Sequence, residues 1–214
     1  MNDSDSRQWW RQQFSPIKQQ YVQQFAKGNT ALDIGTGAGF YGAMLQERGF
    51  QVVGVDIQPQ RDYAYPVVQA RLAALPFQRP FDTVLAFDIL EHEPLEMAAL
   101  HELRRLTGQR LLLSVPNADD ALITPYNLTF KHHIDKTHQR EYHVAGLSDK
   151  LTEAGFYVRH IARRGAVSPA FFSEFVRPTL LRQPTRFLIK ALFKLKVLYN
   201  EALMADLYVV AEPV

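Results

Sequence analysis

The sequence has no cysteine and almost no net charge. Without cysteine among its 214 residues the chain has no disulfide, no thiolate metal site and no cysteine nucleophile, which fits a reducing cytoplasm. The 24 Lys and Arg nearly balance the 22 Asp and Glu, giving a net charge of +2. This balance gives no electrostatic support for nucleic-acid binding, so no nucleic-acid partner is expected.

Long apolar runs are missing as well. No stretch approaches the roughly 18 apolar residues of a membrane span. The first ten residues, MNDSDSRQWW, lack the basic-then-apolar order of a secretory signal. The length suits one α/β domain with a sizeable core, so we predict a single cytoplasmic domain over residues 1–214.

Apolar runs of strand length alternate with segments of helical periodicity. This alternation predicts an α/β three-layer sandwich with a mostly parallel sheet covered on both faces. Helices are expected over residues 8–27, 41–48, from 90 to a stop at 107–108, over 144–156 and within 168–204. Strands are expected at 30–34, 51–57, 66–69, 81–89, 110–117, near 156–162 and at 205–213.

A glycine-rich turn follows the first predicted strand. Residues 35–40 read GTGAGF. A dinucleotide fingerprint requires a sixth-place glycine, where this chain has Phe40, and no phosphate-loop Gly-Lys-Ser/Thr is present. Two readings stay open: tight strand-to-helix packing alone, or close approach of another ligand.

Two acids flank this turn at strand ends. Asp33 closes the first strand, and Asp56 closes the second, where a carboxylate can accept both hydroxyls of a ribose. Simple turn or helix caps are the alternative role. Because Asp33 would repel a polyphosphate, the pattern favours a nucleoside with a positive or zwitterionic tail.

Several stretches together resemble class I S-adenosylmethionine-dependent methyltransferases. The resemblance covers roughly residues 28–165 and the last strand. It implies a Rossmann-like fold with a seven-stranded, mostly parallel sheet whose last strand is antiparallel. It also implies S-adenosyl-L-methionine as cofactor and S-adenosyl-L-homocysteine as product. It rests on ALDIGTGAGFYGAMLQERGFQVVGVDI (31–57), LAALPF (72–77), FDTVLAFDILEHEP (81–94), RLLLSVPN (110–117) and DKLTEAGF (149–156).

The resemblance also implies a set of cofactor-binding residues. Asp56 would hold the ribose hydroxyls, and Ile57 would pack on the adenine. Arg71 and Leu72 fall where the family often has an acid and a small residue, so adenine would be read there by backbone alone. The loop around the methionine part is Asp33, Gly35, Thr36, Gly37, Gly39 and Phe40, with Phe87 and Asp88 beside the transferred methyl.

Histidines supply candidate bases for an oxygen nucleophile. His92 follows the fourth strand, and in many relatives a histidine here has a structural role. Residues 130–143 hold His132, His133, Asp135, His138, Glu141 and His143. We predict His133, His138 and His92 as catalytic candidates. A hydrogen-bonded latch for a lid is an alternative, as is a divalent metal joined by Asp119 and Asp120. The spacing matches no defined metal site, so none is predicted.

The region after the sixth strand is basic and apolar. Residues 177–199 carry six Lys or Arg and no acid. They could form a buried cover helix that packs against the sheet or another subunit, or a membrane-surface helix through 178–200. With Phe171, Phe172 and Phe175 they could also form a wall of the acceptor pocket.

These observations lead to one leading hypothesis and two alternatives. The leading one is methyl transfer to an oxygen of a small-molecule acceptor in a biosynthetic reaction, with a histidine general base. The family's Asn/Asp-Pro-Pro-aromatic motif for amino acceptors is absent at 86–92, AFDILEH. The alternatives are a peripheral membrane enzyme acting on a lipid or isoprenoid-linked acceptor, and a non-catalytic cofactor-binding module. Residues 1–27, 118–143 and 166–204 are expected to form the cap, and the oligomeric state stays open.

Overall fold

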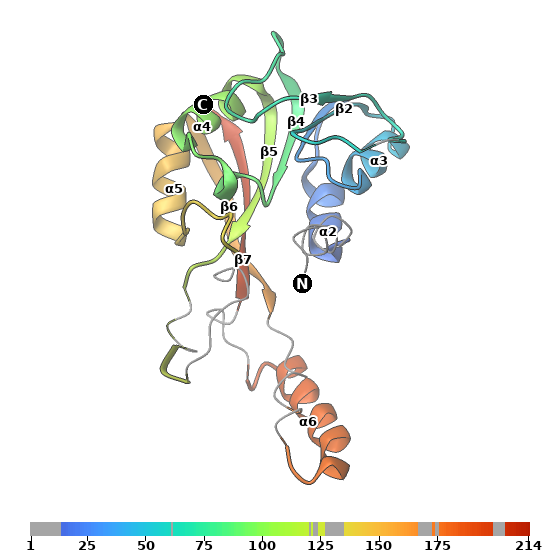
Figure 1. The fold of residues 1–214 in the computed structure, drawn as a ribbon, viewed down its shortest axis with the longest axis vertical. Helices are drawn as coiled ribbons and strands as arrows, with labels where there is room; N and C mark the ends of the chain where they lie inside the picture. The colour runs from blue at the N-terminus through green and yellow to red at the C-terminus, as the bar shows by residue number, and fades with distance from the viewer. Residues whose placement is uncertain are drawn as a thin grey trace.

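A computed structural model describes residues 14–60, 62–119, 121, 124–126, 135–166, 173, 176–198 and 204–214. One seven-stranded sheet in the order β3-β2-β1-β4-β5-β7-β6 organises them. The first five strands in the chain are parallel, and β7 is antiparallel to both β5 and β6, so the predicted fold class is confirmed (Figure 1). The strands are β1 (Thr30–Ile34), β2 (Gln51–Asp56), β3 (Val67–Gln69), β4 (Phe81–Phe87), β5 (Thr107–Pro116), β6 (Phe156–Ala166) and β7 (Met204–Pro213).

Helices cover both faces of this sheet. Successive residues of a strand point to opposite faces, and the core accordingly divides into two clusters. Leu32 of β1 packs in the cluster that includes buried residues of α4 (Glu96–Leu106) and α5 (Val144–Glu153). Ala31 packs in the cluster that includes α2 (Pro16–Phe25) and α3 (Phe40–Glu47). The result is the predicted three-layer arrangement (Figure 1).

The long helix predicted after β4 is split in the structure. A 3-10 turn, η1 (Leu90–His92), comes first, and α4 begins only at Glu96. Glu93, which precedes Pro94, is extended with φ −85° and ψ 116°, because a residue before proline avoids the helical region. The predicted stop at Thr107–Gly108 is confirmed, because α4 ends at Leu106 with Thr107 as its C-cap. The fifth strand, predicted from residue 110, begins earlier, at Thr107.

The helix predicted within residues 8–27 begins, among the described residues, at Pro16 and ends at Phe25. Ser15 caps it by accepting a hydrogen bond from the Lys18 amide, and Pro16 sits at the first helical position, where its missing N–H costs nothing. Trp9 and Trp10 lie outside the described residues.

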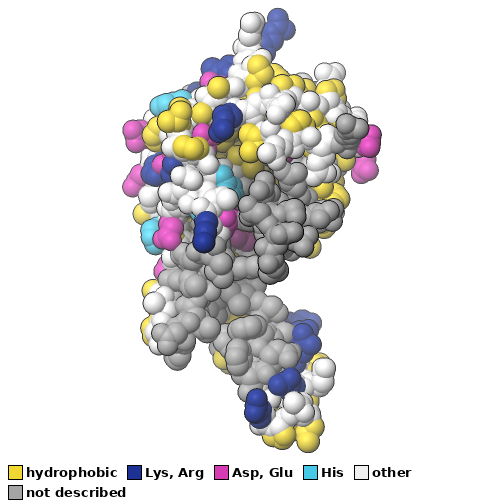
Figure 2. Space-filling view, in the orientation of Figure 1, with side chains coloured by type: hydrophobic (Ala, Val, Ile, Leu, Met, Phe, Trp, Pro, Cys, Tyr) yellow, Lys and Arg dark blue, Asp and Glu magenta, His cyan; other side chains and the backbone are white. Residues whose placement is uncertain are grey.

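The basic region forms α6 (Arg182–Lys194), preceded by the 3-10 turn η5 (Thr179–Leu181). None of the residues of α6 is buried, so α6 does not form a cover helix on the sheet of its own chain. Packing of this helix against another subunit stays a prediction. The helix lies apart from the sheet, and in Figure 2 Lys, Arg and hydrophobic side chains share its surface. Within the described part of the chain, no helix has the length and apolar character to cross a membrane.

Candidate cofactor and acceptor site

The glycine turn is bonded to the neighbouring strand. The amides of Gly35 and Thr36 both donate to the Val55 carbonyl, at 2.8 and 3.1 Å. Gly39 has φ +79° at the N-cap of α3, a left-handed conformation that favours glycine. The turn therefore opens α3 directly above the ends of β1 and β2.

Two glycines of the turn differ in what lies in front of them. A Cβ on Gly35 would meet Ile89 Cδ1 at 2.0 Å, so Gly35 is needed for internal packing. A Cβ on Gly37 would meet nothing closer than the Gly35 carbonyl oxygen at 3.8 Å. Tight packing thus explains Gly35, whereas Gly37 leaves space on the open side of the turn, where the approach of a ligand stays a prediction.

Asp56 lies at the end of β2 with its carboxylate fixed by backbone amides. Oδ2 accepts from the Gly37 amide at 3.1 Å, and Oδ1 accepts from the Gln58 amide at 2.8 Å. These bonds hold the carboxylate at the rim of the turn.

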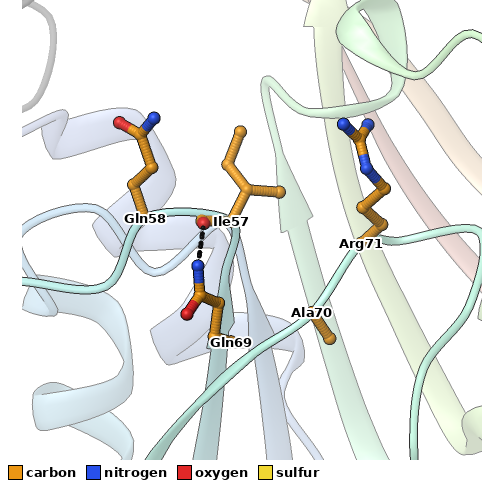
Figure 3. Close-up of a pocket in the computed structure, with 5 residues that line it drawn as sticks. All are labelled: Ile57, Gln58, Gln69, Ala70 and Arg71. Atoms are coloured by element: carbon orange, nitrogen blue, oxygen red, sulfur yellow. Dashed lines mark hydrogen bonds between the residues drawn. The ribbon is translucent and has the colours of Figure 1, made fainter.

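A pocket of about 320 Å³ opens beside Asp56. The Ile57 side chain is 58% exposed and faces the pocket (Figure 3). The side-chain amide Nε2 of Gln69 donates a hydrogen bond to the Ile57 carbonyl at 2.9 Å. Gln58, Gln69 and Ala70 also line it and were missed from the sequence, although Asp56 pairs with Gln69 in the parallel register of β2 and β3. Arg71 also lines the pocket, whereas the Leu72 side chain packs in the core.

Asp33 is buried behind the turn. Its Oδ2 accepts from the Tyr65 hydroxyl at 2.8 Å, a partner that the sequence did not indicate. Burial raises the pKa of Asp33 to about 6, while hydrogen bonds from Tyr65 and from the Gly42 backbone oppose the rise. Ionised Asp33 therefore favours a cation nearby.

Two further residues expected at the cofactor have structural contacts. The Thr36 hydroxyl donates to the Asp33 carbonyl at 2.9 Å and is buried. Phe40 begins α3, and its ring meets the Phe14 ring edge-on at 5.8 Å. Thr36 shapes the turn, and Phe40 links it to the residues that precede α2.

The end of β4 is tied to the N-terminal helix. Asp88, with φ +54°, forms an ion pair with Lys18 of α2 and accepts from the Ser114 hydroxyl at 2.5 Å. Lys18 Nζ also lies 5.7 Å from the centre of the Phe87 ring. Lys18 was missed because nothing local in the sequence links it to a residue 70 positions away.

Two of the three predicted catalytic histidines come together. The rings of His92 in η1 and His138 have centres 4.7 Å apart, and Glu91 and Asp135 lie against them. Burial raises the pKa of the Glu91 carboxyl well above its usual range, and the charge of Asp88 raises it further. His133, His132, Asp120, Phe171, Phe172 and Phe175 lie outside the described residues.

The fold and this site define a class of protein. A parallel sheet with the order 3-2-1-4-5 and an antiparallel edge is the fold of class I S-adenosylmethionine-dependent methyltransferases. Here a glycine turn follows β1, and the acid after β2 is held by backbone amides. The exposed Ile57, the open space at Gly37 and the Asp56 carboxylate fit the nucleoside of that cofactor.

Comparison with known proteins supports this class of protein. Residues 8–161 match the model of a methyltransferase-domain family, and the chain belongs to that family. An uncharacterized methyltransferase of Mycobacterium sp. (strain KMS) is 34% identical over 88 residues, covering 37% of this chain and 35% of the relative. The chain thus spans about a third of the length of the first curated relatives it matches.

Two other similar proteins have named activities. A ubiquinone biosynthesis O-methyltransferase of Alkalilimnicola ehrlichii is 26% identical over 141 residues, covering 54% of this chain and 57% of the relative. The Burkholderia thailandensis 1,6-didemethyltoxoflavin-N1-methyltransferase, solved with S-adenosylhomocysteine, aligns with a TM-score of 0.64 at 18% identity, covering 99% and 83% of the two chains. The predicted family, fold and family cofactor are confirmed.

Proposed function

We propose that this chain transfers a methyl group from S-adenosylmethionine to a hydroxyl oxygen of a small-molecule acceptor. The observation that carries the cofactor assignment is the Asp56 carboxylate, held by the amides of Gly37 and Gln58 at the rim of an open turn. When bound, this cofactor supplies an electrophilic methyl on a sulfonium. Asp56 would hold the ribose, Ile57 and Arg71 would flank the adenine, and buried Asp33 would favour the cationic methionine part.

The histidine pair supplies the proton acceptor. His138 Nε2 lies 3.5 Å from Asp135 Oδ2, so the carboxylate can orient the ring and stabilise its protonated form. In this proposal His138, with His92 beside it, takes the proton of the acceptor hydroxyl and releases it to solvent. His133 stays a prediction for the same role. The name of the Alkalilimnicola relative supports an oxygen acceptor.

The remaining segments would enclose the acceptor. We assign the cap to residues 1–27, 118–143 and 166–204 of a single domain acting in the cytoplasm. Lys18 supports this assignment for the first segment, because it reaches Asp88 at the end of β4. No nucleic-acid partner is proposed, since the chain is nearly neutral overall.

Calorimetric titration with S-adenosylmethionine tests the cofactor site. Asp56→Ala should weaken binding at least about tenfold, because the ribose hydroxyls lose a charge-assisted acceptor. Asp149→Ala, an exposed acid on α5, should bind as the wild type does. Equal affinity of wild type and Asp56→Ala would reject the site.

Two glycines form a second matched pair. Gly37 and Gly49 both have positive φ and open space at Cβ, so alanine should cost each about 1 kcal/mol of folding stability. Only Gly37→Ala should also weaken cofactor binding, because its methyl group enters the open side of the turn. A thermal melt and the same titration measure both effects.

Acceptor screening with labelled cofactor tests the reaction. His138→Ala should lower turnover about 100-fold or more while leaving cofactor affinity near normal. His101→Ala, on the exposed surface of α4, is the control. Labelled product with an N-methyl or C-methyl linkage would overturn the oxygen assignment, and full turnover in His138→Ala would remove the imidazole from the mechanism.

A second candidate is the same reaction at an anionic membrane surface, on a lipid or isoprenoid-linked acceptor. Arg182, Arg186, Lys190 and Lys194 recur every four residues and so share one side of α6. Phe187 and Leu195, 77% and 71% exposed, belong to the adjoining apolar side. A basic stripe beside an exposed apolar stripe favours binding to anionic lipid.

Flotation with vesicles separates the two candidates. The full chain should float with phosphatidylglycerol vesicles and stay behind with phosphatidylcholine alone. Phe187→Ser with Leu195→Ser should abolish flotation, whereas Leu95→Ser, an equally exposed apolar residue on the body, should not. Absence of the wild-type chain from anionic vesicles would reject the membrane candidate.

A further inference from the structure

Glu91, His92 and His138 converge on one point. One carboxylate oxygen of Glu91 and one ring nitrogen of each histidine lie within 4.8 Å of one another. Glu91 and His92 come from η1, directly after β4, and His138 comes from the segment before α5. Two imidazoles and one carboxylate are a donor set found in transition-metal sites.

Glu91 is the second observation that points to a ligand. Its side chain is only 1% exposed, and within the described part of the chain neither carboxylate oxygen has a hydrogen-bond partner. His92 Nε2 lies 3.9 Å from Oε1. A buried carboxylate without a partner is costly, and a bound cation would remove that cost.

Thr137 fixes which nitrogen of His92 carries the proton. The Thr137 hydroxyl donates its one proton to Asp135 Oδ1 at 2.7 Å. Its 3.0 Å contact with His92 Nδ1 must therefore have the imidazole as donor. The neutral ring then carries its lone pair on Nε2, the nitrogen beside Glu91. Such a carboxylate-linked contact behind a histidine is what metal ligands usually have.

Backbone contacts hold the two halves of the cluster together. The Gln139 amide donates to the Glu91 carbonyl at 2.8 Å. The Arg140 guanidinium donates to the carbonyls of Leu90 and Pro94, each at 3.1 Å. His138 is thus placed against η1 by its chain neighbours.

We propose that Glu91, His92 and His138 bind one divalent transition-metal ion of the Zn²⁺ type. Two nitrogen donors favour such an ion over Mg²⁺ or Ca²⁺, which prefer oxygen ligands. Zn–N bonds of about 2.0–2.1 Å would draw the donors closer than they are in the free protein. Three protein ligands leave a coordination position open for an acceptor oxygen.

The catalytic role of this ion rests on the proposed methyl transfer. An acceptor hydroxyl on the open position loses its proton to solvent more readily, as metal-bound water does. The oxygen then forms a bond with the methyl carbon while the carbon–sulfur bond breaks and its electron pair stays on sulfur. In the ion-loaded protein His92 and His138 therefore hold the ion, and the role of His138 as proton acceptor proposed above applies to the ion-free chain.

Metal binding is measured first, without any acceptor. The full chain is stripped with chelator and titrated with Zn²⁺ and with Co²⁺, whose visible bands report nitrogen and oxygen coordination. One ion per chain is expected, with Mg²⁺ unable to displace it. Glu91→Gln and His92→Ala should each weaken binding at least about tenfold, while His101→Ala should not. No stoichiometric Zn²⁺ or Co²⁺ binding would overturn the proposal.

Thr137→Val tests the positioning role with little change of shape. It removes the hydroxyl that orients His92, so metal affinity should fall about 10–100-fold. Unchanged affinity and unchanged Co²⁺ bands in this variant would contradict the assigned tautomer and ligand set. A normal thermal melt of Glu91→Gln and Thr137→Val would show that both variants are folded.

The activity measurement separates this inference from the proposed function. Methyl transfer that stops on chelation and returns with Zn²⁺ supports both. Full transfer by the stripped chain rejects the metal's role and leaves the methyltransferase standing. A third outcome is that the chain binds one ion, the ligand variants lose that binding, and the chain has no affinity for the cofactor. This outcome supports the metal site and rejects the proposed function.

Discussion

Asp33 shows how a single buried charge can serve binding at the expense of stability. It is almost fully buried, and the charge of Asp56 also raises its pKa, whereas Lys18 lowers it. The carboxylate is therefore costly in the empty site and useful beside a cationic cofactor. Local sequence placed Asp33 at a strand end, but only the fold brought Tyr65 to it.

The raised pKa of Asp33 predicts a pH-dependent stability. Because the pKa of Asp33 is raised in the folded state, its contribution to the free energy of unfolding is most favourable below about pH 4. That contribution is lost as the pH rises through about 6. Above pH 7 the Asp33→Asn protein should therefore be more stable than the wild type, by at most about 3 kcal/mol in free energy of unfolding, and should melt at a higher temperature. The difference should shrink toward pH 4.

Thermal melts of the empty proteins between pH 4 and 8 check this. Asp149→Asn makes the same charge change on the surface and serves as control. The same Asp33→Asn protein should bind S-adenosylmethionine more weakly at pH 7.5. A stability gain that is equal at all pH values would contradict the buried-charge explanation.

At the scale of elements, the structure depends on ties between distant segments. α2 is joined to the end of β4 by Lys18 and Asp88, whose side chains are 14% and 44% exposed. Although burial lowers the pKa of Lys18, the ion pair and hydrogen bond with Asp88 raise it overall. Lys18 also lowers the pKa of Asp206, which burial and Asp88 raise to about 7.

Lys18→Met should lower the free energy of unfolding by about 1–3 kcal/mol, because it leaves Asp88 and Asp206 without their cation. Adding Asp88→Asn should restore part of that loss, as expected for coupled neighbours. Lys27→Met breaks the exposed 3.7 Å pair with Glu212 and should cost less than about 0.5 kcal/mol. Denaturant unfolding measures these changes. Equal losses of unfolding free energy in Lys18→Met and Lys27→Met would show that the Lys18–Asp88 ion pair contributes no more than an exposed pair.

For the whole molecule, sheet order decides where the site lies. The chain runs outward from β1 through β2 to β3, then returns to place β4 on the other side of β1. The ends of β1, β2 and β4 therefore face one crevice, where open α/β sheets bind their ligands. The antiparallel pair β6–β7 forms the opposite edge of the sheet, and residues 167–203 connect these two strands in the sequence.

This arrangement predicts that the segment between β6 and β7 can be removed. Ala166 pairs with Met204 in the antiparallel ladder, so an Asn-Gly turn can replace residues 167–203. The shortened chain should melt within about 4 °C of the full chain and keep its affinity for S-adenosylmethionine. It should lose vesicle flotation if α6 is the membrane contact.

Circular dichroism melting and the cofactor titration measure these outcomes. A second shortened chain with a four-residue Gly-Ser loop controls for the turn chemistry. Melting more than about 10 °C lower in both shortened chains would show that the segment is part of the core.

The sequence by itself determined the elements whose signals are local. Apolar runs marked the seven strands, GTGAGF marked the turn, and Asp33 and Asp56 marked strand ends, because each signal lies within a few neighbouring residues. It did not fix the start of α4 at Glu96 or the start of β5 at Thr107, because such boundaries depend on tertiary contacts.

Only the tertiary structure decided which distant side chains meet. Lys18 and Asp88 are 70 positions apart, Thr137 and His92 are 45 apart, and Tyr65 and Asp33 are 32 apart. No pattern of composition or periodicity encodes such pairs, because they arise when the sheet order folds remote segments onto the same edge. The convergence of Glu91, His92 and His138 belongs to this second kind of information.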